Sequence, residues 1–439
     1  MMTDTIAALA TASMPGAIAV LRVSGPAAFS IVQAVASVDL TDAEGYTIHH
    51  GYIMEDNRAV DEVLFSVFRA PHSYTGEDSI EISCHGGVYI ARKILSLLFG
   101  AGARPALRGE FTRRAFLNGK IDLAQAESVN DLIQARDEVN AESAIRALRG
   151  SVERLLTPFM EELTQIIAQI EVNIDYPEYD DVQQLVQEEL LPKVRAWNGR
   201  LETIVQAAQK AVLVRRGIDT VIIGRPNVGK SSLLNALLEE DKAIVTDIAG
   251  TTRDLVEGDV RVGDLTLHLI DTAGIHTAEN PVEAIGIEKS RMVLKKAQLV
   301  LLVVDGSQPL TKEDELLLDE TKDCNRIVVY NKRDLKETGA AISAAQGDIA
   351  ALEEAIVEKY ADGLLFAQSD TFNNERQIAL ALQAMHAMRQ VQESLEDGAS
   401  VDLVTMDLQD AWEALKQITG EAGREDLLDE IFSRFCLGK

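Results

Sequence analysis

The stretch Gly224-Arg-Pro-Asn-Val-Gly-Lys-Ser231 follows an apolar run at 220–223 and precedes a helix-like run at 232–238. Strand, glycine-rich turn and helix in this order are the context of a phosphate-binding P-loop. Backbone N–H groups of the turn and of the helix start face the phosphates, and Lys230 adds charge at the β and γ groups. The pattern predicts phosphate contacts from Asn227, Val228, Gly229, Lys230, Ser231 and Ser232, with Ser231 also available to Mg²⁺.

Three later motifs specify the nucleotide. Asp271-Thr272-Ala273-Gly274 ends a predicted strand at 265–270, which brings a carboxylate near the metal and a glycine N–H near the γ-phosphate. Thr251 or Thr252 can complete the Mg²⁺ shell. Asn331-Lys332-Arg-Asp334 ends another strand, and Asp334 can accept hydrogen bonds from N1–H and the exocyclic amine of guanine, a donor pair that adenine lacks. We therefore expect GTP, with Ser343 and Ala344 in the last base-contacting loop.

The group that orients the attacking water is open at this point. Many small GTPases carry glutamine directly after Asp-x-x-Gly, but that position is Ile275 here. The carboxylates nearby are Glu279, Glu283 and Glu288.

Length and composition limit the remaining possibilities. The chain has 439 residues and a formal net charge of −28. About 150 residues per domain predicts about three domains, and an acidic surface repels nucleic acid unless a local patch or a partner attracts it. Without an apolar run of about 18 residues or a secretory leader, we expect a cytoplasmic protein that does not bind a membrane. Cys84, Cys324 and Cys436 lie far apart, so free thiols are expected.

The hydrophobic pattern changes three times along the chain. Residues 1–118 alternate short strand-like runs with helices, and residues 119–214 and 373–439 have the 3.6-residue period of amphipathic helices. Residues 215–372 contain buried strands at 220–223, 265–270, 299–304 and 327–330, which predicts a parallel sheet with crossovers. The expected fold is multidomain α/β plus all-α, with a Ras-like P-loop G domain inserted into a helical domain.

Several unusual strings occur together outside the G domain. They are Ser73-Tyr-Thr-Gly-Glu-Asp78, Cys84-His-Gly-Gly87, Gly109-Glu-Phe-Thr-Arg-Arg-Ala-Phe-Leu-Asn-Gly-Lys120, Asp122-Leu-Ala-Gln-Ala-Glu127 and the terminal Phe435-Cys-Leu-Gly-Lys439. With the central G domain, they resemble the MnmE (TrmE) family of tRNA modification GTPases nearly from end to end.

The resemblance implies a homodimer formed through an N-terminal domain similar to tetrahydrofolate-binding enzymes. Its folate, a 5-formyl- or 5,10-methylene-tetrahydrofolate, would contact Arg22, Glu81, Lys120 and Lys439. Cations suit the glutamate tail of folate, and a carboxylate suits the donors of the pterin ring.

The resemblance also implies that K⁺ replaces an arginine finger. Asn227, Thr246, Ile248 and Thr251 would hold the cation, and Thr252 would join Ser231 on Mg²⁺. The whole loop would line the GTP: Thr246, Asp247, Ile248, Ala249, Gly250, Thr251 and Thr252. The water-orienting glutamate would be Glu283. A lone cysteine is usually a small core residue, so Cys436 is either that or a catalytic group.

The activity implied by the family is addition of a carboxymethylaminomethyl or aminomethyl group at C5 of the wobble uridine of certain tRNAs. The partner would be MnmG, which uses FAD and NADH, in a heterotetrameric or larger complex, and a GTP-driven cycle of G-domain dimerisation would accompany the reaction. Two alternatives are a switch GTPase of ribosome assembly, and a one-carbon transferase with a merely regulatory G domain.

Some features depart from the family pattern or are ambiguous. The loop Thr11-Ala-Ser-Met-Pro-Gly16 lacks the usual arginine-glycine pair, and His276 and Ala345 replace common arginine and lysine. The pair Cys84-His85 is either a nucleophile with its base or a tight turn at the folate pocket, the second being favoured. The cluster Arg113, Arg114 and Lys120 either contacts tRNA or is solvated helix charge.

Overall fold

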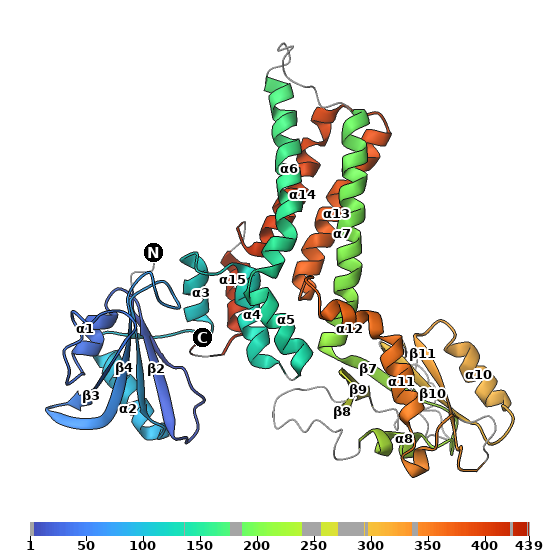
Figure 1. Ribbon diagram of the computed structural model, residues 1–439, viewed down its shortest axis with the longest axis horizontal. Helices are drawn as coiled ribbons and strands as arrows, with labels where there is room; N and C mark the ends of the chain where they lie inside the picture. The colour runs from blue at the N-terminus through green and yellow to red at the C-terminus, as the bar shows by residue number, and fades with distance from the viewer. Residues whose placement is uncertain are drawn as a thin grey trace, which may run out of the picture. The chain divides into compact units, whose positions relative to one another are not determined.

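A computed structural model of the chain describes residues 4–135, 137–175, 187–238, 256–270, 294, 297–335, 341–421, 425–436 and 438. The chain forms two compact units (Figure 1). The first comprises Met1–Ala135, Ala144–Arg195 and Gln383–Lys439, and the second comprises Arg136–Ser143 and Ala196–Leu382. Within the described residues, no helix combines the length and the apolarity that crossing a membrane requires.

The N-terminal part of the first unit is a six-stranded sheet of order β3-β4-β5-β2-β1-β6. Side chains alternate between its faces: Leu21 and Ile82 are buried in the core with helices α1 (Ala28–Gln33) and α2 (Val88–Gly100), whereas Arg22 and Glu81 lie on the other face. The strands are β1 (Ile6–Leu9), β2 (Ile18–Ser24), β3 (Thr47–Glu55), β4 (Arg58–Phe68), β5 (Ser79–His85) and β6 (Arg104–Pro105).

Helices make up the rest of the first unit. They are α3 (Glu110–Leu117), α4 (Leu123–Gln134), α6 (Ser151–Asp175), η3 (Val401–Val404), α14 (Thr405–Thr419) and α15 (Glu425–Ser433), with parts of α5 (Glu138–Leu148), α7 (Gln187–Arg216) and α13 (Glu375–Glu396). A capping box between Asp122 and Gln125 begins α4, so that part of the string at 122–127 has a structural role. Helix α7 begins before Pro192, and Leu190 and Val194 on either side of the proline are both buried.

The second unit is built on a five-stranded sheet of order β11-β10-β7-β9-β8, in which β8 alone pairs antiparallel. Its strands are β7 (Ile218–Ile223), β8 (Val256–Val262), β9 (Leu265–Ile270), β10 (Leu299–Asp305) and β11 (Arg326–Asn331). Its further helices are α8 (Lys230–Leu237), α10 (Lys312–Glu320), η2 (Ala344–Gln346), α11 (Ala350–Lys359) and α12 (Ala361–Ala367). The predicted parallel sheet is confirmed, and the edge strand β8 is an addition to it.

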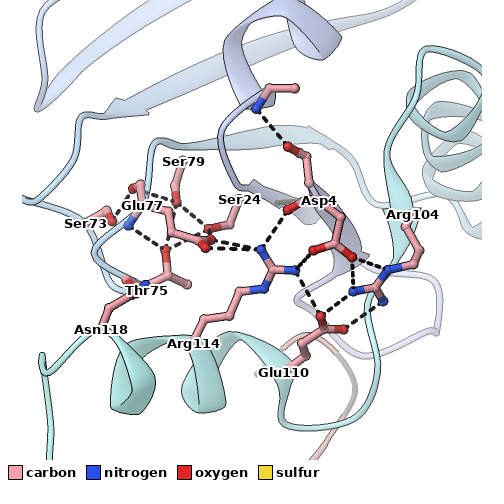
Figure 2. A network of polar contacts seen from close by, with 12 residues as sticks. Asp4, Ser24, Ser73, Thr75, Glu77, Ser79, Arg104, Glu110, Arg114 and Asn118 are labelled. Carbon is pink, nitrogen blue, oxygen red and sulfur yellow. Dashed lines mark hydrogen bonds and ion pairs between the residues drawn. The ribbon is translucent and has the colours of Figure 1, made fainter. Parts of the chain in front are cut away.

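A buried polar network joins α3 to the N-terminal sheet (Figure 2). Arg114 is 1% exposed, and its guanidinium donates to Asp4 Oδ1 at 2.8 Å, Glu110 Oε1 at 3.1 Å and Glu77 Oε1 at 3.2 Å. Arg104 adds a second cation to Glu110, with Nη2 2.5 Å from Oε1. Both predictions for Arg114, a tRNA contact and a solvated helix charge, are therefore wrong, because its cation is buried among carboxylates.

The network makes this contact sensitive to pH. Burial by itself would raise the pKa of Glu110, but hydrogen bonds from Arg104, the Leu107 N–H and Arg114 hold that pKa below its ordinary value. A carboxyl whose pKa is lowered by folding stabilises the fold above its unfolded pKa. This contribution is lost as the pH falls through the folded pKa.

We expect Arg114→Met to destabilise the sheet–α3 contact by about 3–5 kcal/mol, because it leaves buried carboxylates without their cation. Hydrogen exchange of peptides covering β1 and α3 in the full chain measures the opening free energy. Arg113→Met is the matched control, since Arg113 pairs with the exposed Asp429 and its loss should cost about 0–1 kcal/mol. Equal effects of the two variants would refute a structural role for the network.

Candidate functional site

The P-loop turn between β7 and α8 needs glycine at two positions. At Gly224, with φ of +156°, an added Cβ would lie 2.4 Å from the backbone oxygen of Val303. At Gly229, with φ of +99°, it would lie 2.3 Å from Nδ2 of Asn331. Both glycines allow the loop backbone to approach its neighbours more closely than any side chain permits.

The side chain of Lys230 forms hydrogen bonds with the backbone of the P-loop. Its Nζ donates to the backbone oxygens of Gly224 at 2.8 Å and of Arg225 at 3.0 Å. Burial lowers the pKa of Lys230. The ammonium group is thus held against the turn that is predicted to surround the phosphates.

The predicted cation ligands of the described P-loop are accessible. Asn227 has a left-handed backbone with φ of 63° and is exposed, as is Ser231 in the first turn of α8. Val228 is buried beneath the loop, and Ser232 is half-buried. Hydroxyl and amide oxygens are suitable ligands for Mg²⁺ and K⁺, so the described part of each ligand set fits its ion.

The predicted base motif contacts the P-loop directly. Asn331 Nδ2 donates to Val228 O at 2.9 Å, and Asn331 Oδ1 accepts from the Ala344 N–H at 3.0 Å. Ser343 Oγ donates to Asp334 Oδ1 at 2.6 Å, which orients a carboxylate that stays exposed. The structure therefore brings the P-loop, the Asn-Lys-Arg-Asp motif and the Ser343 loop together, as the sequence predicted.

Other predicted site residues lie outside the described residues. They comprise the loop Thr246–Thr252, the motif Asp271–Gly274, the water-orienting candidates Glu279, Glu283 and Glu288, and the terminal Lys439. Their roles stay predictions.

Two candidate folate residues form an ion pair on the face of the N-terminal sheet that lies opposite α1 and α2. Arg22 on β2 and Glu81 on β5 are cross-strand neighbours, with Nη2 2.7 Å from Oε1. The Arg22 guanidinium also lies 5.2 Å from the ring centre of Tyr74 and 5.5 Å from that of Phe111. Lys120 is exposed, and its Nζ donates to Pro71 O at 3.0 Å.

The C-terminal segment returns to the N-terminal sheet. The backbone oxygen of Cys436 accepts from the Gly109 N–H at 3.4 Å, and a Cβ at Gly438 would lie 2.4 Å from Leu9 O at the end of β1. Cys436 is exposed, unlike the buried Cys84. Cys436 is therefore not a core residue, and it lies on the same unit as Arg22 and Glu81.

Cys84 and His85 do not form a nucleophile–base pair. Cys84 is buried on the apolar face of β5, where burial and the neighbouring Asp61 raise the pKa of its thiol to about 11. His85 is exposed and contacts Asp61, with Nδ1 2.7 Å from Oδ1. Adjacent residues of a strand point to opposite faces, so the nucleophile–base interpretation is wrong. Gly86 pairs with Gly16 and Ala17 through backbone hydrogen bonds, and a tight turn at the folate pocket stays a prediction.

Two residues of the G domain were missed by the sequence reasoning. Asp305 ends the wholly buried strand β10 and accepts from Lys332 Nζ at 2.7 Å. Arg225, within the P-loop, pairs with Asp314. A charged residue directly after an apolar strand was the available signal for Asp305.

Two family models and the relatives given below match nearly the whole length of this chain, and all of them carry the names MnmE or TrmE. A family model described as "MnmE helical domain" matches residues 123–436, and one described as "GTP-binding protein TrmE N-terminus" matches residues 5–120. Two relatives are named tRNA modification GTPase MnmE. One, from Lactococcus lactis subsp. cremoris (strain MG1363), is 46% identical over 99% of this chain and 98% of the relative. The other, from Listeria welshimeri, is 45% identical over 99% of each chain.

Among solved structures, the G domain of the T. maritima FeoB iron transporter is 30% identical. It covers 33% of this chain and 98% of that one, with a TM-score of 0.24.

We expect Asp334→Asn to lower affinity for GDP by at least about a hundredfold, because an amide N–H would face the donors of guanine. Xanthosine diphosphate, which carries a carbonyl where guanine has its amine, should bind the variant better than GDP does. Equilibrium titration with both nucleotides checks this. Asp264→Asn, at an exposed partner of Arg261, is the control, and unchanged GDP binding by Asp334→Asn would contradict the assignment.

Proposed function

Because the chain belongs to the family of the tRNA modification GTPase MnmE, we propose that it binds and hydrolyses GTP as part of a tRNA modification reaction. The contact of Asn331 with the P-loop carries this proposal, since it joins a phosphate cradle to a motif that suits guanine. Ser343 holds the carboxylate of Asp334 in place for that base.

The residues of the G site have distinct roles in hydrolysis. Lys230 neutralises charge on the β and γ phosphates, and Ser231 with Thr252 would hold Mg²⁺. Asn227, with Thr246, Ile248 and Thr251, would hold K⁺, and Glu283 would orient the water. A monovalent cation beside the phosphates supplies positive charge where the transition state gains negative charge.

A tetrahydrofolate one-carbon donor is proposed to bind at Arg22 and Glu81, with Lys120 and Lys439. The side chains of Arg22 and Glu81 are 17% and 28% exposed, so both remain accessible to a ligand. Their cation and carboxylate match the acidic tail and the donor-rich ring of folate. The return of the C-terminal segment to β1 supports a role for Cys436 on this side of the protein.

Homodimerisation through the N-terminal domain is supported by exposed apolar side chains on the sheet face opposite α1 and α2. Ile48, Ser66, Glu81 and Arg22 are successive cross-strand neighbours, so their side chains share that face. Large apolar side chains are exposed on it: Ile18, Ile48, Tyr52 and Leu64. Exposed apolar groups on one sheet face are typical of an interaction surface.

The full proposal is that this chain works with MnmG, the FAD- and NADH-using partner, in a heterotetrameric or larger complex. Together they would add the aminomethyl-type group at C5 of the wobble uridine, while GTP drives a G-domain dimerisation cycle. The domains would be 1–118, 119–214, 215–372 and 373–439, the second and last forming the helical domain.

We expect GTP turnover in KCl to exceed that in NaCl by at least about tenfold, because the cation offsets transition-state charge. Asn227→Ala should abolish this difference, while Asn235→Ala, an exposed position on α8, should keep it. Steady-state phosphate release in the two salts measures the ratio. Equal rates for the unaltered chain would refute the potassium role.

Wobble-uridine modification in vivo separates the rival functions. Cells whose only copy carries Lys230→Ala should lose the modified nucleoside, because Lys230 holds the phosphates; mass spectrometry of digested tRNA detects it. Lys322→Ala, an exposed surface pair with Asp319, is the control. Normal modification with Lys230→Ala would favour a merely regulatory G domain, and no modification by the unaltered chain would favour a pure switch protein.

A further inference from the structure

Arg225 is the second residue of the P-loop, and no contact with nucleotide or metal is predicted for its side chain. It is 16% exposed, and its Nε donates to Asp314 Oδ2 at 3.2 Å. Its Nη2 lies 3.6 Å from Asp305 Oδ2. Both carboxylates are almost completely buried, at 2% and 3% exposed.

The two carboxylates belong to rigid parts of the G domain. Asp314 closes the capping box that begins α10, where its Oδ2 accepts from Thr311 N at 3.0 Å and Thr311 Oγ1 at 2.7 Å. Asp305 ends the buried strand β10 and also accepts from Lys332 of the base motif. Arg225 thus connects the phosphate loop with the start of a helix and with the end of a core strand.

The contact contributes little as a source of stability. Arg225 Nη2 and Asp314 Oδ1 are buried without a hydrogen-bond partner. A buried ion pair that leaves polar atoms unsatisfied gains little net free energy over an apolar pair. What the pair does supply is a defined position for the loop backbone at Arg225.

The P-loop is held at two points. Asn331 holds it at Val228, and Arg225 holds it near its start. Lys230 further restrains that start, because it donates to the backbone oxygens of Gly224 and Arg225. Backbone N–H groups bind phosphate well only when they are fixed within about 0.5 Å of the productive geometry. A loop anchored at one end only would lose that preorganisation.

We propose that Arg225 is a positioning residue that fixes the P-loop for its nucleotide by anchoring it to Asp314 at the start of α10 and to Asp305 at the end of β10. The inference rests on the proposed GTPase function. Loop contacts are common to bound nucleotide and transition state, so their loss weakens binding without slowing the bound complex.

The test compares full-length variants in GTP turnover and in GDP binding. Arg225→Ala should raise KM and the Kd for GDP by about tenfold, with kcat changed less than about twofold. Arg225→Lys should recover part of the loss, because an ammonium can still reach Asp314. Asp314→Ala, which removes the oxygen that Arg225 and Thr311 share, should mimic Arg225→Ala and add little in the double variant.

Two matched variants isolate the anchoring from helix stability and from general loss of charge. Thr311→Ala removes the hydroxyl of the capping box but leaves Arg225 and Asp314 paired, and Arg261→Ala removes an exposed cation elsewhere in the domain. Both should leave KM unchanged. A merely structural role of Arg225 would instead lower the fraction of active protein, which lowers apparent kcat at constant KM.

Unchanged KM and GDP affinity in Arg225→Ala, a loss in kcat alone, or full additivity with Asp314→Ala would each overturn the proposal. Failure of the unaltered chain to bind GDP or to hydrolyse GTP would instead contradict the proposed function. The two failures are thus distinguished by whether the unaltered chain or only its variants behave unexpectedly.

Discussion

The side chain of Asn331 holds the G site together. Its amide donates to Val228 of the P-loop and accepts from Ala344 of the neighbouring loop, so one planar group sets the distance between the phosphate cradle and the base motif. The close approach depends on Gly229, where any Cβ would meet the Asn331 amide nitrogen. Because both oxygen and nitrogen of the amide are engaged, no other side chain of similar size could replace it.

Buried or half-buried cations paired with carboxylates recur in this acidic protein. Arg114 joins α3 to the N-terminal sheet through Asp4 and Glu77, and Arg225 joins the P-loop to Asp314. Each cation connects segments that are separated in sequence. Since an unpaired buried charge costs several kcal/mol, each network also raises the free energy of conformations in which its segments are separated.

The sequence predicted the G domain well because its signals are local. Strands at 220–223, 299–304 and 327–330 are nearly continuous apolar runs, the strand at 265–270 alternates apolar and polar residues, and each is a strand of the sheet. Strand β8 escaped prediction because only its buried Val260 and Val262 alternate with polar residues, as on an edge strand. The contacts of Arg114 with Asp4 and Glu77, and of Arg225 with Asp314, could not be recognised, because these carboxylates come from distant positions and sequence spacing does not reveal such contacts.

The central claim is that one guanine nucleotide is held between the turn at 224–231 and the carboxylate of Asp334. Its most direct test is an equilibrium titration of the full-length chain with GDP and, separately, with ADP in the presence of Mg²⁺. A site that accepts two hydrogen bonds from guanine should bind GDP more tightly than ADP by at least about a thousandfold. Comparable affinities for the two nucleotides would contradict the account.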